Sequence, residues 1–179
     1  LNRLKKGDFS IEALPRVGVK IDDKSIYPAL NDVAIFSSKS ATLVEHVLRV
    51  NGEEIWHDSS DGLIISTPIG SSAYSMSAGG PAVYQNSKVF CIVSVNSLDI
   101  TRRPLIVPED TLIEIDDISS SLRCEVVVDG KDRFKVDKIV TCTKFPQPAN
   151  VIRMKKDSTT VSALAKKVKL ADELLNMPP

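Results

Sequence analysis

Short apolar runs closed by turn-forming pairs constrain the fold of this chain more than any other feature. Asn51-Gly52 and Asp129-Gly130 each stand between two such runs, and these dipeptides are the preferred centres of type I′ hairpin turns. No helical pattern of the length needed to link parallel strands separates the runs. The pattern therefore predicts strands that pair antiparallel with their neighbours along the chain.

Runs of this kind are numerous enough to build more than one sheet. Because a sheet with one apolar face must cover that face, the sequence predicts a mainly β fold: an antiparallel two-sheet β-sandwich with short helices and a C-terminal helix. The predicted strands cover residues 17–21, 25–27, 33–36, 43–50, 53–56, 63–65, 89–95, 111–115, 124–128, 133–136 and 139–142.

Breaker residues divide the chain into three parts. Gly7 closes what looks like a last helical turn, and Leu1 is not a start methionine, so we expect residues 1–10 to end a preceding N-terminal domain. Residues 11–145 form the predicted sandwich. Pro146 and Pro148 predict a linker, and residues 146–179 add a C-terminal helix, with apolar positions at helical spacing at Val161, Leu164, Val168, Ala171 and Leu175.

Composition argues against several function classes. Lys plus Arg equal Asp plus Glu at 23 each, so the chain has no net basic charge for nucleic acid or an anionic membrane. No apolar run approaches the roughly 20 residues that span a bilayer. The odd number of cysteines and their strand-like neighbours favour reduced thiols in a core, and we expect a cytoplasmic protein. Neither histidine has partners at zinc-ligand spacing, so we expect no metal site.

The stretch from Asp61 to Pro81 changes character in the middle. An apolar strand, 63–65, ends at Thr67-Pro68-Ile69-Gly70, because Pro has no donor for the sheet and Gly favours a turn. Ser71 and Ser72 are suited to cap a short helix that Pro81 stops. A strand, a turn and a helix start point backbone N–H groups and hydroxyls at one spot, which suits a ribose, an amide or a phosphate.

Known motifs based on spacing do not match this stretch. A P-loop needs a Lys that is absent after Gly70, no glycine spacing matches the dinucleotide fingerprint, and no Ser lies between two glycines as in a nucleophile elbow. Spacing alone leaves open that the two serines only cap a helix and that Tyr74 packs in the core.

The string nevertheless closely resembles the nucleotide-binding signature of NAD kinases, over about twenty positions. That signature reads Asp-Gly-Leu, a strand, Thr-Pro-Thr-Gly-Ser-Thr-Ala-Tyr-Ser and then Ala-Gly-Gly-Pro. Ile69 and Ser72 each replace a Thr. Asn31-Asp32 is similar to the family's Asn-Glu pair, Asn96 replaces a His, and Asp129-Gly130 matches an Asp-Gly beside the family's active site.

The resemblance covers roughly residues 10 to 150 and implies the C-terminal, NAD-binding domain of such a kinase. It implies that Asp129 lies beside the reacting ribose as a candidate catalytic residue. The residues that it implies for NAD binding are Asn31, Asp32, Asp61, Thr67, Ser72, Ala73, Tyr74 and Ser77.

The resemblance also implies partners. The family transfers a phosphoryl group from ATP or polyphosphate, with Mg²⁺, to the 2′-hydroxyl of the adenosine ribose of NAD, which gives NADP. A separate N-terminal domain carries Gly-Gly-Asp-Gly-Thr and the main catalytic Asp, and no Gly-Gly-Asp occurs in this sequence. The chain alone is therefore expected to be inactive. Family members are typically homo-oligomers, dimers or tetramers, whose sites borrow residues from a neighbouring subunit.

Two interpretations remain open at this point. The chain is either the acceptor-binding half of an NAD kinase or a non-catalytic nucleotide-binding module of the same fold. Lipid kinases that share the Gly-Gly-Asp-Gly-Thr domain are a weaker third option, because they do not usually carry this Thr-Pro-Gly-Ser-Ala-Tyr string.

Overall fold

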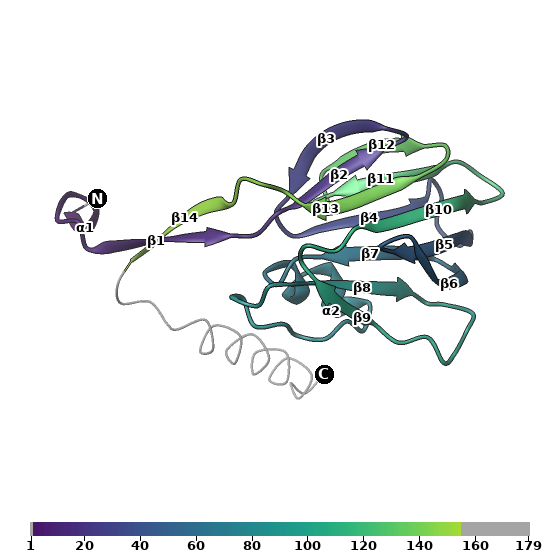
Figure 1. Ribbon diagram of the computed structural model, residues 1–179, viewed down its shortest axis with the longest axis horizontal. Coiled ribbons are helices and arrows are strands. Elements are labelled where there is room, and N and C mark those ends of the chain that lie inside the picture. The colour runs from purple at the N-terminus through teal and green to yellow at the C-terminus, as the bar shows by residue number, and fades with distance from the viewer. Residues whose placement is uncertain (1, 155–179) are drawn as a thin grey trace, which may run out of the picture.

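Two six-stranded antiparallel sheets pack face to face in the computed structural model, which describes residues 2–154 (Figure 1). The first sheet, in spatial order, contains β3 (Lys24–Ala29), β2 (Val17–Ile21), β13 (Val140–Lys144), β10 (Ile113–Ser119), β5 (Val44–Val50) and β6 (Glu53–Ser60). The second contains β12 (Asp132–Val136), β11 (Cys124–Val128), β4 (Asp32–Ser37), β7 (Gly62–Ser66), β8 (Val89–Val95) and β9 (Leu105–Pro108). The predicted antiparallel two-sheet sandwich is confirmed.

The predicted hairpin turns are confirmed in their backbone angles. Asn51 and Gly52 have φ of 53° and 83° between β5 and β6, and Asp129 and Gly130 have φ of 49° and 65° between β11 and β12. Type I′ turns need positive φ at both central residues, which Asn, Asp and Gly tolerate best. Local turn chemistry thus sets which strands become neighbours at both places.

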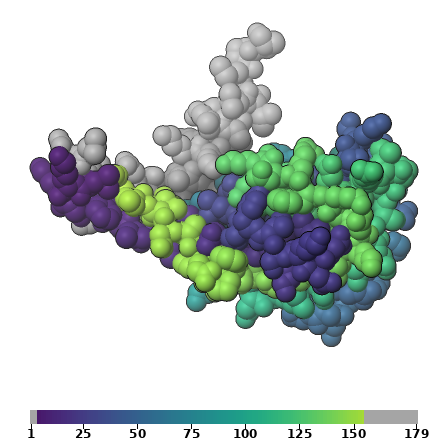
Figure 2. All heavy atoms as spheres, turned by 90° about the horizontal axis from the view of Figure 1, so that it is seen from above, coloured from purple at the N-terminus to yellow at the C-terminus, as the bar shows by residue number. Residues whose placement is uncertain are grey.

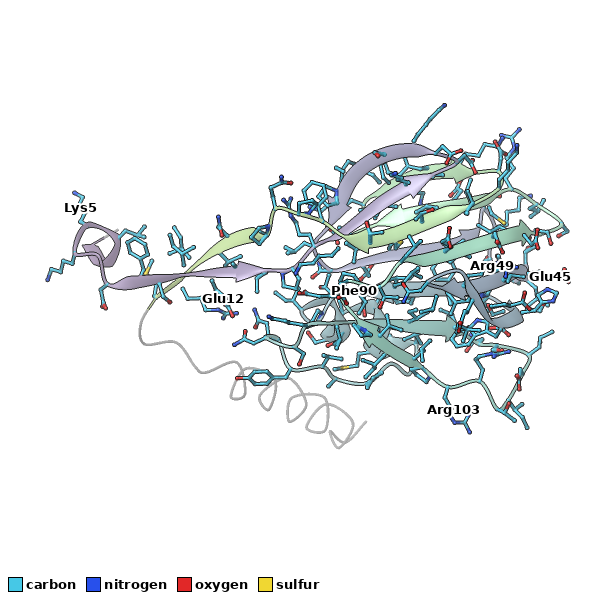
Figure 3. All side chains as sticks on the ribbon, in the orientation of Figure 1. Lys5, Glu12, Glu45, Arg49, Phe90 and Arg103 are labelled. Carbon is cyan, nitrogen blue, oxygen red and sulfur yellow. The ribbon has the colours of Figure 1, made fainter. Side chains whose placement is uncertain are left out.

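The core lies between the sheets and is formed by alternate residues of each strand. Phe90 on β8 is completely buried in this layer (Figure 3). Cys91, Cys124 and Cys142 are buried free thiols, and burial raises the pKa of each, which agrees with the predicted reduced core.

A two-stranded ribbon of β1 (Phe9–Leu14) and β14 (Ala149–Met154) leads away from the sandwich (Figures 1 and 2). The predicted linker is therefore wrong over residues 149–154, which pair with residues 9–14 in an unbroken antiparallel register. The helix α1 (Asn2–Lys5) precedes the ribbon, and Gly7 ends it with φ of 66°, as predicted. The predicted C-terminal helix lies outside the described residues.

Two short helices lie after β7: η1 (Gly70–Ser72) and α2 (Tyr74–Ser77). The predicted capping by Ser71 and Ser72 is wrong. The Ser71 hydroxyl donates to the Pro68 carbonyl and accepts from the Val83 N–H, and the Ser72 hydroxyl donates to the Ile69 carbonyl. Both hydroxyls therefore brace the turn, and Ser71 also joins it to the segment after α2. Between residues 2 and 154, no helix has the length and apolar character to cross a bilayer.

The outer face of the second sheet carries the features that build the site. Cross-strand pairing aligns Arg133 of β12 with Val127 of β11, Val127 with Ala34 of β4, and Ala34 with Ile64 of β7. A small apolar cluster of Ala34, Ile64 and Val95, with Phe36, Ala78 and Val127 packed against it, lies on this face. This side of the sheet is apolar although it faces away from the core.

Candidate functional site

A cavity of about 560 Å³ lies over the outer face of the second sheet. Three separate parts of the chain contribute to it: the start and end of β4, the turn before α2, and the hairpin of β11 and β12. Its lining residues are Asn31, Asp32, Ala34, Phe36, Ser37, Ser38, Ser40, Ala73, Tyr74, Val127, Asp129, Gly130 and Arg133.

The floor and one wall of the cavity are apolar. Ala34 and Val127 are paired neighbours on the sheet, and the rings of Phe36 and Tyr74 stack beside them with centroids 5.7 Å apart and 27° between their planes. Tyr74 keeps 46% of its surface exposed. A part-exposed ring beside an apolar floor suits a planar heterocycle.

The opposite end of the cavity is built on the carboxylate of Asp129. Its Oδ1 accepts hydrogen bonds from the N–H groups of Asn31 (2.7 Å) and Asp32 (3.2 Å), and its Oδ2 accepts one from Leu30 (2.9 Å). The Asp129 N–H in turn donates to the Asp32 carbonyl at 3.0 Å. Asp129 thus fixes the backbone that carries Asn31 and Asp32.

Thr67 and Gly70 hold the same backbone from the other side. The Thr67 hydroxyl donates to the Leu30 carbonyl at 2.6 Å, and the Thr67 N–H donates to the Asn31 carbonyl at 2.9 Å. A Cβ on Gly70 would lie 1.9 Å from the Asn31 carbonyl oxygen, which only glycine avoids. The Thr-Pro-Ile-Gly turn is therefore seated directly on the Asn-Asp pair.

Asp32 is an unusual carboxyl group. It is only 5% exposed, and burial together with the nearby negative charge of Asp129 raises its pKa to about 6. Its protonated form therefore contributes most to stability at acid pH, and that contribution is lost as the pH rises through about 6. A ligand that donates a hydrogen bond to the charged carboxylate of Asp32 would offset the free energy of ionising it in this buried position.

The structure brings together five of the residues that the resemblance implies. Asn31, Asp32, Ala73, Tyr74 and Asp129 all line the cavity, although they come from three regions of the sequence.

The other implied residues do not line this cavity. Thr67 is fully buried beneath it, Ser72 is bonded within its own turn, and Ser77 is exposed on α2. Asp61 directly precedes β7, and its carboxylate accepts a hydrogen bond of 2.8 Å from the side chain of Asn96.

Sequence reasoning missed several residues of the cavity, above all Phe36, Val127 and Arg133. The available signal was the alternation of side chains along a strand, which places Ala34 and Phe36 on one face. That signal becomes useful only when the strand that pairs with β4 is known, and β11 lies about ninety positions further along the chain.

Comparisons with known proteins show the family and the fold of this chain. A family model described as the ATP-NAD kinase C-terminal domain matches residues 30–154. An NAD kinase of Methanopyrus kandleri is 36% identical over 153 residues, which cover 86% of this chain and 55% of the relative. An NAD kinase of Alcanivorax borkumensis is 35% identical over 126 residues, or 69% of this chain and 42% of the relative. The chain spans about half the length of the curated relatives that it matches.

Two solved structures are similar to this chain over 94% of its length. One is a crystal structure of an NAD kinase from Archaeoglobus fulgidus in complex with ATP, with a TM-score of 0.80, 30% identity and 63% of that chain covered. The other is yeast NADH kinase complexed with NADH, with a TM-score of 0.80, 21% identity and 52% of that chain covered. At that lower identity the second structure supports only the fold.

We predict that Asp129→Asn lowers the free energy of unfolding by about 1–3 kcal/mol, because the amide cannot accept all three backbone N–H groups. Asn still tolerates positive φ, so backbone strain is not the cause. Asp117→Asn is the matched control, since Asp117 is exposed and has φ of 47°. Urea unfolding measures both variants, and equal stability of the two would contradict the role given to Asp129.

Proposed function

The chain belongs to the NAD kinase family, and from this premise we propose that it is the acceptor-binding half of an enzyme that phosphorylates NAD. The reaction transfers a phosphoryl group from ATP to the 2′-hydroxyl of the adenosine ribose and gives NADP. One observation carries the proposal: the cavity unites Asn31 and Asp32 with Ala73 and Tyr74, so two distant parts of the family's signature meet on one surface.

In this proposal each part of the cavity has a chemical task. A base of the dinucleotide lies on Ala34 and Val127 and stacks on Tyr74, while Asn31 and Asp32 accept hydrogen bonds from ribose hydroxyls. Asp129 borders the reacting ribose. Because its carboxylate already accepts three backbone N–H groups, we assign it to positioning Asn31 and Asp32.

Residues beneath and beside the cavity complete the assignment. Thr67 supports the Asn31 backbone from below, and Ser72 and Ser77 flank Tyr74 as candidate contacts to the parts of NAD that extend beyond the cavity. The donor, ATP or polyphosphate, needs a phosphate cradle and Mg²⁺. Neither the Gly-Gly-Asp string nor, within residues 2–154, a group of three metal-ligating side chains is present. We assign the donor site to the Gly-Gly-Asp-Gly-Thr domain that the family resemblance implies.

The test of acceptor binding is calorimetric titration of the chain with NAD. We expect Tyr74→Ala to weaken binding about tenfold, since stacking of one base on an aromatic ring contributes about 1–3 kcal/mol. Tyr84→Ala is the matched control, because Tyr84 is exposed to nearly the same extent, 44%, and lies outside the cavity. Equal affinity of the two variants would refute the assigned site.

Turnover separates the kinase from the alternative, a non-catalytic binding module. The chain alone should bind NAD and form no NADP with ATP and Mg²⁺, whereas the protein that also contains the Gly-Gly-Asp-Gly-Thr half should form NADP. A protein with that half that binds NAD but never phosphorylates it would leave the binding module as the function.

The raised pKa of Asp32 predicts a pH dependence of binding. If its charged form accepts hydrogen bonds from ribose, affinity for NAD should rise as the pH rises through about 6 and level off above it. Asp32→Asn should remove this dependence, since an amide does not titrate. Titrations across that pH range measure the profile, and an unchanged profile in Asp32→Asn would show that another group titrates.

We also propose that copies of this protein associate as dimers or tetramers. Asp61, which the family resemblance assigns to NAD binding, does not line the cavity of its own copy and lies beside the exposed residue Asn96. In the proposed assembly a neighbouring copy brings its Asp61 to this site. Light scattering should therefore give at least a dimer mass, and a monomer mass at every accessible concentration would contradict the association.

A further inference from the structure

If the cavity binds a dinucleotide, the negative charges of the ligand lie near acidic side chains. A pyrophosphate carries two negative charges, and two of the charged residues that line the cavity, Asp32 and Asp129, are acidic. Among its lining residues, all of which the structure describes, Arg133 is the one cation. We propose that Arg133 binds the pyrophosphate of the acceptor and thereby makes the site prefer a dinucleotide over a nucleoside; this rests on the proposed function.

The strand register places Arg133 at the open edge of the cavity. Arg133 is paired with Val127, which is paired with Ala34, so the three side chains form one row on the outer face of the sheet. β12 is the edge strand of that sheet, and the side chain of Arg133 is 61% exposed. A base on the Ala34 and Val127 floor would therefore leave its phosphates within reach of this edge.

The guanidinium keeps donors available while one partner orients it. Its Nη1 lies 3.1 Å from Oε2 of Glu125, a residue of the neighbouring strand β11. Guanidinium groups have five N–H donors in a planar fork, so a single contact leaves others for phosphate oxygens. An exposed ion pair of this kind contributes little to stability. The Glu125 contact is thus better explained as orientation of Arg133 than as a support of the fold.

The acidic end of the cavity is compatible with an anionic ligand. The negative charge of Asp129 is directed at three backbone N–H groups, whose partial positive charges offset it. Lys135, two residues further along β12, lies outside the cavity lining and pairs with Asp137 at 2.5 Å. Removing the charge of Lys135 therefore shows how much the overall positive potential at this edge of the sheet contributes to binding.

The test compares NAD with adenosine, which has no phosphate, by calorimetric titration of the full chain. At low ionic strength we expect Arg133→Gln to weaken NAD binding about five- to tenfold, because an exposed charge-assisted contact is partly screened. Adenosine binding should change by less than about twofold, because the nucleoside has no group for this cation. The effect on NAD should shrink at high ionic strength, and Arg133→Lys should restore most of the affinity.

Lys135→Gln is the matched control, with the same loss of charge on the same strand, and should leave both affinities unchanged. Equal losses for NAD and adenosine in Arg133→Gln would overturn the proposal, as would an unchanged affinity for NAD or an equal effect of Lys135→Gln. If the wild-type chain binds neither probe, the proposed function itself fails. If it binds both and Arg133→Gln leaves their ratio unchanged, only the role of Arg133 fails.

Discussion

The carboxylate of Asp129 organises the site, because it accepts the N–H groups of three successive residues, Leu30 to Asp32. In a turn between two strands, backbone N–H groups of this kind normally donate hydrogen bonds to water. Here the hairpin of β11 and β12 supplies the acceptor, and Thr67 and Gly70 close on the same backbone from the opposite side. Three segments therefore become one rigid corner, and the cavity is the space beside that corner.

That arrangement also explains the electrostatics of the cavity. Holding Asp32 next to Asp129, nearly out of contact with solvent, makes a second negative charge costly and raises the pKa of Asp32 to about 6. Buried carboxyls with shifted pKa values are frequent at functional sites. The apolar floor and the aromatic wall face solvent on the outer side of the sheet, so the cavity does not weaken the core between the two sheets.

Much of the fold follows from local chemistry. Asn51-Gly52 and Asp129-Gly130 adopt the positive φ that their residue types favour, and each fixes a hairpin. The site was less predictable. Asn31 and Tyr74 were identified only because their surroundings resemble a known family. For Phe36, Val127 and Arg133 the alternation along a strand becomes informative only once the pairing of β4 with β11 is known. Ser71 and Ser72 are residue types that favour helix caps, yet their hydroxyls donate to the carbonyls of Pro68 and Ile69.

The sequence by itself determined the two hairpin turns, the family and most of the strands, because each depends on residues adjacent along the chain. It did not predict β1, β9 or β14. Tertiary structure alone decided which distant residues meet. β1 pairs with β14 and β4 pairs with β11 across most of the chain, and strand register sets which side chains share a face. Asp129 reached the amides of Leu30 to Asp32, and Arg133 reached the edge of the cavity, only because those pairings formed. Local sequence patterns do not predict contacts between residues that lie so far apart along the chain.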